Sequence, residues 1–541
     1  MSTLPDPMSH RARRIGGALL AALTGAAIAR AEEPVDLDLV NRIRDEGFHH
    51  SQVAEIATHL TDVIGARVTG SPSMLRANEW TRDELTSFGL VQARLEAYDF
   101  GRGWSWTHCH LDLLGESATS LHAIPQAWTP GTAGVVEGDA MRLKVEKVEE
   151  LEAFRGKLSG KIVLVSEPRK VAPRVQVAFS RLTSDTLAAR EAFEIPEMQE
   201  GDSEWAKGYR KRLPLRRALD AFLFAEGALA IIEVSSRDHG ILRVPRGGEP
   251  VDAEPMRIPA VSLITEHYNR LLRLLDKGVT VRLRLDVAAT FHDNAGKAFN
   301  TVAEIQGGDK KNELVIAGAH LDSYQSGNGA ADNAAGCAVV MEAVRILEAL
   351  GVEPRRTVRV ILWSGEEQGL LGSKAYVNQH FASRPAWPDS ELHLPVSLRR
   401  SPGPLTFKPA QAKVSGYFNL DNGSGKIRGI YLEENAAVRP ILSAWLAPFA
   451  DLGVETVTLN RTTGTDHMSF DHVGIPGFQF VQDPLDYSPQ AHHSHLDTYD
   501  HVLPDDLRQA AVVMAAVLAH AANRDAMLPR KPRPAALPSH N

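Results

Sequence analysis

The sequence predicts an α/β fold in which a mostly parallel central sheet, flanked by helices, carries an inserted smaller β-rich domain. From about Phe299 to Asn523, short apolar runs alternate with helical segments, an order typical of a parallel sheet covered by helices. From about Leu113 up to that point, strand-like runs form a separate β-rich stretch. The length of 541 residues also favours more than one domain.

The N-terminus has the pattern of an export signal. Arginines within Arg11–Arg14 precede the apolar run Ile15–Ile28, and Ala29–Ala31 supplies small residues for a cleavage site. We therefore predict a signal peptide over residues 1–31 and an exported protein, periplasmic or extracellular. An N-terminal anchor or an ordinary helix is the alternative, and Arg13-Arg14 leaves the twin-arginine export route open.

The first part of the main domain is expected over residues 32–112. Helical segments at about 36–64 and 73–88 open it, and a strand-like run at 93–98 follows them. The turn signal Arg67–Pro72 separates the two helices.

The inserted domain is expected over residues 113–292. Its strand-like runs lie at 160–165, 258–263 and 279–285. The charged stretch 167–212 is predicted to be an excursion rather than core. The main domain resumes over residues 293–525, and we predict a disordered tail over 526–541, which is rich in Pro, Lys and Arg.

Composition excludes several kinds of partner. The formal charge of −8 is mild for this length, and no basic patch suits nucleic acid or a membrane surface. After the N-terminal segment, no run is long and apolar enough to span a membrane. Cys109 and Cys337, the only cysteines, are predicted to be buried free thiols, although an exported protein could pair them.

Side chains with metal-binding chemistry accompany the apolar runs of the main domain. Three of these runs are Leu314–Ala319, Val358–Trp363 and Tyr417–Leu420. The candidate ligands at or beyond such runs are His320, Asp332, Glu366, Glu367, Asp421 and one histidine of His492–His495. In an open α/β sheet, ligands bind beyond the carboxyl ends of the strands. Imidazole and carboxylate without thiolate are the donors of a hydrolytic zinc site.

Taken alone, each candidate ligand also has an interpretation that involves no metal. Asp332 precedes a helix and could be its N-cap, and Asp421 stands before a flexible turn. The spacing of the histidine cluster does not say which ring would bind a metal. The trio Thr465–His467 is either a turn with a helix cap or a set of groups around the site.

The paired glutamates suggest a division of labour. Beside a metal, one carboxylate of Glu366-Glu367 can hold the ion while its neighbour takes a proton from water. Asp322 points to the same side of its strand as His320 and is placed to accept the second ring N–H. Three carboxylates and one hydroxide would balance the charge of two Zn²⁺ ions.

Together, these segments resemble the M28 family of zinc exopeptidases, over about Phe299–Val502. The motifs that carry the likeness are Ala319–Asp322, Gly329–Asn333, Gly365–Ser373, Asn419–Asp421 and His493–Thr498, with Arg67–Ser71 near the N-terminus. The β-rich insertion resembles a protease-associated domain. The arrangement is most similar to the plasma glutamate carboxypeptidase, or carboxypeptidase Q-like, branch, whose members act on dipeptides and short peptides.

The resemblance implies a role for each candidate residue. The implied metal ligands are His320 and Asp421 for one zinc, Glu367 and His493 for the other, and Asp332 for both. Glu366 would be the general base and acid, and Asp322 would orient the ring of His320. The choice of His493 depends on the family's spacing to a downstream Asp-Thr pair, and His495 is its close competitor.

The resemblance therefore implies an exported zinc exopeptidase with two ions per chain, either an aminopeptidase or a dipeptidase. Small peptides would be its substrates, and a homodimer is a candidate assembly. A glutaminyl cyclase-like acyl transferase with one zinc is a second hypothesis. A non-catalytic binding protein that kept the fold is a third. The complete set of ligands argues against both.

Overall fold

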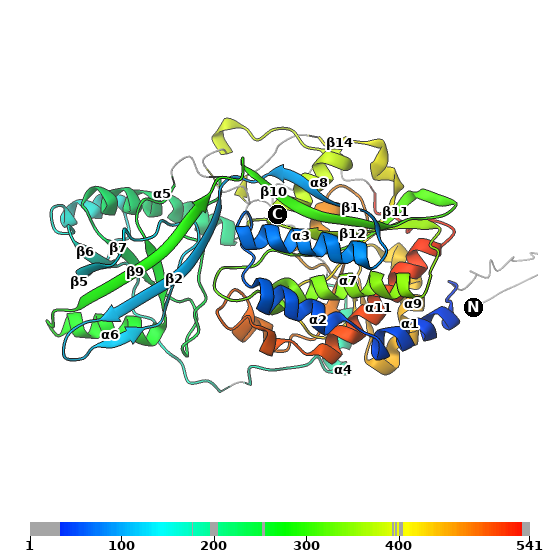
Figure 1. Cartoon of the computed structure of the whole chain (residues 1–541), viewed down its shortest axis with the longest axis horizontal. Helices are drawn as coiled ribbons and strands as arrows, with labels where there is room; N and C mark the ends of the chain where they lie inside the picture. Colours follow the sequence, from blue (N-terminus) through cyan, green and yellow to red (C-terminus); the bar gives the residue numbers. More distant parts are fainter. Residues whose placement is uncertain are drawn as a thin grey trace, which may run out of the picture.

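The computed structural model describes residues 33–175, 177–194, 204–251, 255–391, 394, 398–399 and 404–532. The predicted signal peptide, residues 1–31, lies outside the described residues. Within them, the chain folds around two sheets that lie side by side, each with its own helices (Figure 1).

The larger sheet has eight strands among the described residues. Their order is β1 (Val91–Asp99), β10 (Lys297–Ile305), β12 (Arg356–Trp363), β11 (Lys310–His320), β15 (Val414–Asn419), β18 (Gly477–Gln482), β16 (Ile427–Tyr431) and β17 (Thr456–Thr458). Strands β12, β11, β15 and β18 are parallel, whereas β10 and β16 run antiparallel to their inner neighbours. The predicted α/β fold is confirmed, with a sheet that is parallel at its centre.

Helices cover both faces of this sheet. One face packs against α1 (Leu37–His49), α2 (Val53–Thr58), α3 (Pro72–Ser87), α7 (Ala335–Ala349), α9 (Arg439–Leu446) and α11 (Pro504–Asn523). The other face packs against α8 (Leu371–His380) and α10 (His467–Asp471). Figure 1 shows α1, α2, α3, α7 and α11 in front of the larger sheet.

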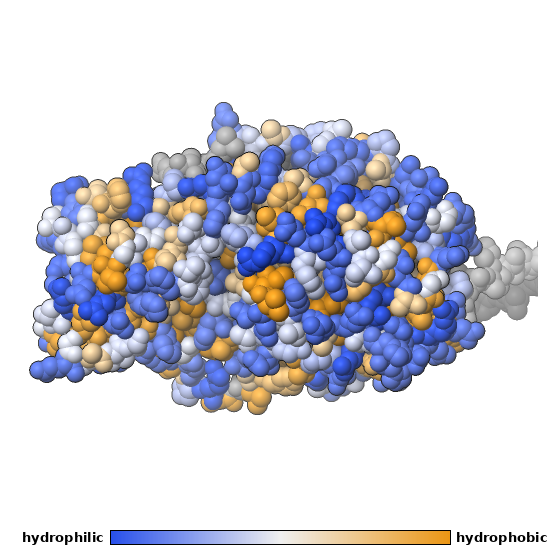
Figure 2. Space-filling model, viewed as in Figure 1, coloured by the Kyte–Doolittle hydropathy of each residue, from blue (hydrophilic) through white to orange (hydrophobic). Residues whose placement is uncertain are grey.

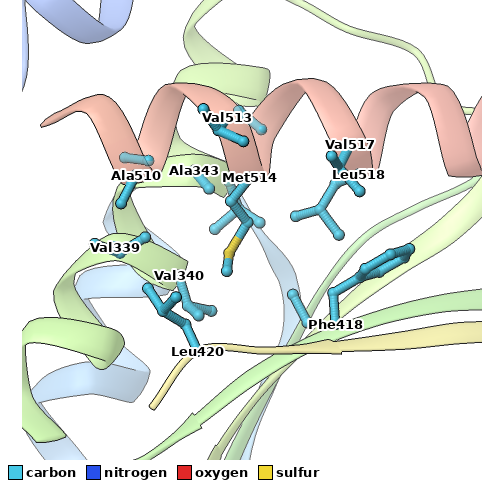
Figure 3. Packing of buried hydrophobic residues seen from close by; sticks show 14 of the residues in the cluster. Val339, Val340, Ala343, Phe418, Leu420, Ala510, Val513, Met514, Val517 and Leu518 are labelled. Atoms are coloured by element: carbon cyan, nitrogen blue, oxygen red, sulfur yellow. The ribbon is translucent and has the colours of Figure 1, made fainter. Parts of the chain in front are cut away.

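The centre of the core lies between α7, α11 and β15. Both helices are apolar around most of their circumference, which is the composition of a fully buried helix. Met514 of α11 points toward Val340 of α7, and Phe418 of β15 closes the space beneath them (Figure 3). The face of the molecule seen in Figure 2 is mostly hydrophilic, with hydrophobic groups scattered over it.

The second sheet is formed by the chain between β1 and β10. Its described strands, in order, are β3 (Thr119–Leu121), β2 (Gly103–Leu113), β9 (Arg282–His292), β5 (Val136–Arg142), β6 (Lys161–Leu164), β7 (Ala230–Val234), β8 (Ala260–Leu263) and β4 (Ala123–Pro125). Helix α6 (Thr265–Asp276) packs on its core. The sheet begins at Gly103, before the expected boundary at residue 113, because β2 pairs with β9 along its whole length.

Part of the charged excursion crosses to the larger sheet. Helix α4 (Ser184–Glu191) packs against the edge strand β17, away from the second sheet (Figure 1). Arg181, just before α4, pairs with Asp483 at 2.8 Å and with Asp506 at 2.7 Å. Arg428 donates to the carbonyl oxygen of Leu182 at 2.8 Å. We call residues 180–194 the crossing segment; it covers a sheet edge that would otherwise be open.

The predicted disordered tail, residues 526–541, is wrong for its described part, which ends at residue 532. Leu528 is buried in the main core, and Arg530 donates to the carbonyl oxygen of Gln411 at 2.9 Å. Lys531 pairs with Asp471 at 2.7 Å. The prediction of disorder rested on the content of Pro, Lys and Arg. Composition does not show the carbonyl and carboxylate groups elsewhere in the chain that bind these basic side chains. No helix in the described part of the chain is long and apolar enough to span a membrane.

Candidate metal centre

The sheet topology brings three of the predicted segments to one edge. β11 lies between β12 and β15 and is parallel to both, so the carboxyl ends of the three strands are neighbours. His320 ends β11, the Glu366-Glu367 pair follows β12, and Asp421 follows β15. The sequence therefore folds these side chains together through ordinary strand pairing.

The predicted ligands meet around Asp332. Its Oδ1 lies 3.2 Å from His320 Nε2, and its Oδ2 lies 3.4 Å from His493 Nε2. His320 Nε2 is also 3.4 Å from Asp421 Oδ1, and His493 Nε2 is 3.1 Å from Glu367 Oε2. Two groups thus share one carboxylate, His320 with Asp421 on one side and Glu367 with His493 on the other.

The donor atoms fit a metal. Asp332 Oδ2 and Glu367 Oε1 are buried and have no hydrogen-bond partner among the described residues. His320, Asp332 and Asp421 present ligand atoms that all lie within 4.8 Å of one another. Buried carboxylate oxygens without a partner are costly unless a cation or a proton satisfies them.

Crowded acids dominate the electrostatics of the site. Burial raises the pKa of Glu366 and of Glu367 well above the ordinary value, and nearby carboxylates add to the rise. Burial would also raise the pKa of Asp332, but interactions led by the hydrogen bond with His320 outweigh burial and lower that pKa. The cluster is anionic, as a site for divalent cations should be.

The N-cap interpretation of Asp332 is wrong. Asn333, its neighbour, accepts from the backbone N–H of Gly336 at 3.0 Å at the start of α7. Asp332 itself makes no cap hydrogen bond and points to the histidines. Asp497 holds the loop by accepting from the N–H of Ala331 at 2.6 Å.

Asp322 positions more than the ring of His320. The Nδ1 atom of His320 lies 3.0 Å from the backbone carbonyl of Asp322 and 3.6 Å from its carboxylate. That carboxylate instead accepts from Thr69 Oγ1 at 2.9 Å and from the backbone N–H groups of Glu366 and Glu367 at 3.2 and 3.3 Å. The residue therefore fixes the turn that carries both glutamates.

The histidine cluster separates in space. His493 lies in the site, stacked on Tyr324 with ring centroids 3.8 Å apart. His495 turns away, and its Nδ1 accepts from the N–H of Leu242 at 3.0 Å. His492, whose ring lies at a tilt of 42° to that of His493, comes within 4.0 Å of Asp332 Oδ2. Within the described chain, His492 and not His495 is the nearer competitor.

Asp466 is a group whose position the sequence left open. Its Oδ1 accepts from Ser373 Oγ at 2.5 Å, whereas its Oδ2 is buried without a partner. Burial raises the pKa of Asp466 to about 7. Although it precedes α10, its side chain makes no cap hydrogen bond. Of the two interpretations of Thr465–His467, the structure favours a group beside the site over a helix cap.

Comparison with known proteins places this site in a family. The model of peptidase family M28 matches residues 300–518, which include every candidate ligand. The region of the chain that carries the site belongs to peptidase family M28. The family predicted from the sequence is confirmed, and with it the class of metallo-exopeptidase.

Relatives of this M28 chain match most of its length. Carboxypeptidase Q of Bos taurus is 27% identical over 511 residues, which cover 90% of this chain and 92% of that protein. The crystal structure of a peptidase M28 precursor from Shewanella amazonensis superposes with a TM-score of 0.63 at 23% identity, covering 92% and 98% of the two chains. The zinc aminopeptidase BSAP of Bacillus subtilis gives a TM-score of 0.54 at 17% identity, covering 87% and 95%.

Proposed function

We propose that this M28 peptidase is an exported dinuclear zinc exopeptidase that cleaves dipeptides or short peptides. The observation that carries the proposal is the carboxylate of Asp332, which lies between two separate histidine and carboxylate pairs. A single ion would leave one of those pairs without a cation. The M28 family and its zinc aminopeptidase structures support the choice of zinc.

The proposed ligands are His320 and Asp421 for one ion and Glu367 and His493 for the other, with Asp332 bridging. Burial lowers the pKa of His493 to about 3, so the ring is neutral and its lone pair is available. Zinc bound there would polarise the scissile carbonyl and lower the pKa of the attacking water.

Glu366 is the proposed general base and acid. It is buried beside the ligands, and its backbone is held by Asp322 at 3.2 Å. A carboxylate at this position can take a proton from the attacking water. The new C–O bond forms as water gives up this proton, and Glu366 then passes the proton to the nitrogen of the leaving amine as the peptide C–N bond breaks.

The domain assignments remain part of the proposal. We propose residues 1–31 as a signal peptide and the predicted insertion, 113–292, as a protease-associated-like domain whose start is moved to Gly103. The segments on either side of it form the proposed catalytic domain. The carboxypeptidase Q relatives support an exported protein. A homodimer is proposed as the assembly.

Metal content and substrate screening together test the function. The purified protein should contain about two zinc ions per chain. It should hydrolyse amino-acid amides or dipeptides with a free amine, lose this activity on chelation and regain it with zinc. One ion per chain together with pyroglutamate formation from N-terminal glutamine would identify a cyclase instead. Hydrolysis of N-acetylated peptides at the same rate as free ones would contradict the exopeptidase proposal.

A further inference from the structure

Two arginines of the second sheet reach the rim of the metal centre. Arg237 and Arg243 lie in the loop between β7 and β8, and Ser235 accepts from the backbone N–H of both, at 3.2 and 3.0 Å. Leu242 and Val244 are buried beneath the loop in a small apolar cluster. The loop is thus held firmly on the second sheet.

This arginine loop is joined to the segment that carries His493. Arg243 forms an isolated antiparallel bridge with Ser494, and the N–H of His495 donates to the carbonyl oxygen of Leu242 at 3.0 Å. The guanidinium of Arg243 lies 3.4 Å from His493 Nδ1, and that of Arg237 lies 3.4 Å from the carbonyl oxygen of His492.

Neither arginine has a carboxylate partner among the described residues. Arg246, three residues further on, is different because it pairs with Glu249 at 3.1 Å. The Nε atom of Arg243 is buried and has no hydrogen-bond partner within the described part of the chain. Burial and the neighbouring charge of Arg243 together lower the pKa of Arg237 to about 10. Two cations therefore lie at the rim with part of their hydrogen-bonding capacity unused.

Once a metal is bound, the ring of His493 cannot serve as a hydrogen-bond acceptor for Arg243. A neutral imidazole whose Nε2 binds a metal carries its proton on Nδ1 and is a donor there. A guanidinium has only donors, so the two groups cannot hydrogen-bond to each other. A negatively charged group bound in the site could supply an acceptor for Arg243.

We propose that Arg243, supported by Arg237, binds the free carboxylate of a dipeptide substrate. The proposal rests on the peptidase function proposed above and deepens it. A guanidinium binds a carboxylate through two parallel hydrogen bonds, which no amide can match. In a dipeptide the carboxylate is only about one Cα–Cα step, ~3.8 Å, beyond the scissile bond. Arg243 contacts the ring of His493, one of the proposed zinc ligands, so its guanidinium lies at the edge of the proposed metal centre.

Three matched substrates test this assignment: Ala-Leu, its C-terminal amide, and the amide of Ala-Glu, whose only carboxylate is on the side chain. In the wild type, kcat/KM should be about 10- to 100-fold higher for Ala-Leu than for either amide, the range for a hydrogen bond to a charged group. Arg243→Gln should remove this preference and change the rates for the amides by less than about 3-fold. Arg243→Lys should keep part of the preference, because lysine keeps the positive charge but cannot form the two parallel hydrogen bonds of a guanidinium.

Arg284→Gln is the control, because Arg284 belongs to the same sheet but is exposed and paired with Glu137 at 2.8 Å. This substitution should leave the ratio of kcat/KM for Ala-Leu to kcat/KM for its amide unchanged. Binding is measured separately by calorimetry in a Glu366→Gln background, where Ala-Leu should bind more tightly than its amide only while Arg243 is present. If Arg243→Gln lowered kcat/KM equally for Ala-Leu and for its C-terminal amide, the proposal would be overturned. An Arg243-dependent preference for the amide of Ala-Glu would also overturn it. If no peptide is cleaved by the wild type, the peptidase proposal fails, while calorimetry still decides the role of Arg243.

Discussion

At the scale of the residue, Asp332 determines how the centre is organised. Each of its carboxylate oxygens faces a different histidine, His320 at 3.2 Å and His493 at 3.4 Å. Its freedom to do so depends on Asn333, which accepts the hydrogen bond at the start of α7. Two adjacent residues thus divide two tasks, holding the helix start and facing the ligands.

Replacement of Glu366 by glutamine tests the proposed general base. Glutamine keeps the size of the side chain but cannot accept a proton, so kcat should fall by about 10²- to 10⁴-fold. Zinc content should stay at the wild-type level because Glu366 is not a proposed ligand. Activity is measured on a dipeptide and metal content by atomic absorption. A variant that turns over at the wild-type rate would exclude Glu366 as the base.

His472 should make the fold sensitive to acid. Burial lowers the pKa of His472 to about 3, with the charge of Arg384 adding to the effect. The folded state therefore keeps the ring neutral, whereas the unfolded chain takes up a proton below about pH 6.5. Stability from this residue is complete above that pH and is lost as the pH falls toward 3. At pH 5 the loss should be about 2 kcal/mol.

His472→Gln should reduce the fall in Tm between pH 7.5 and pH 5 relative to the wild type. Both proteins are measured with chelator present, so that release of metal in acid does not contribute. His50→Gln, a surface substitution, is the control and should show the wild-type dependence on pH. An unchanged pH dependence in His472→Gln would contradict the assignment.

At the scale of the element, the parallel strands position the ligands and α7 with α11 hold the strands. Met514 of α11 is fully buried between the two helices and β15. Met514→Ala should lower the free energy of unfolding by about 2–5 kcal/mol, because it removes buried apolar volume and leaves a cavity. The side chain of Leu75 in α3 is 41% exposed, so Leu75→Ala should lower the free energy of unfolding by only about 0.5 kcal/mol or less. Chemical denaturation of both variants checks this; equal losses would show that the α7–α11 contact is not central to the core.

The sequence allowed the strand-end residues to be predicted because their pattern is local. An apolar run followed by His320, Asp421 or a glutamate pair is visible without coordinates, and parallel pairing then brings the ends together. Arg243 and Asp466 could not be placed this way. Their neighbours are His493 and Ser373, far away in the chain, and nothing in the intervening sequence encodes the contact. The buried Leu528 was missed for the same reason.

At the scale of the whole molecule, the metal centre lies where the two sheets meet. The ligands come from the larger sheet, whereas the loop of Arg237 and Arg243 comes from the second sheet and is joined to the segment of His493. The crossing segment ties the chain of the second sheet to Asp483 and Asp506. Loss of the metal or substitution of a ligand should therefore also weaken the contact between the larger sheet and the second sheet.

Removal of the metal should destabilise the whole chain. A cation that binds only the folded state raises its stability by RT ln(1 + [L]/Kd), about 4 kcal/mol at a thousandfold excess over Kd. Without it, the buried carboxylates of Asp332, Glu367 and Asp421 face one another with fewer opposing charges. Chelation should thus lower Tm, and added zinc should restore it. Asp332→Asn should show a lower Tm in zinc and a much smaller response to chelator, because it loses the bridging charge. A wild-type Tm that does not respond to chelator, in protein shown to be metal-loaded beforehand, would mean that the ions bind without stabilising the fold.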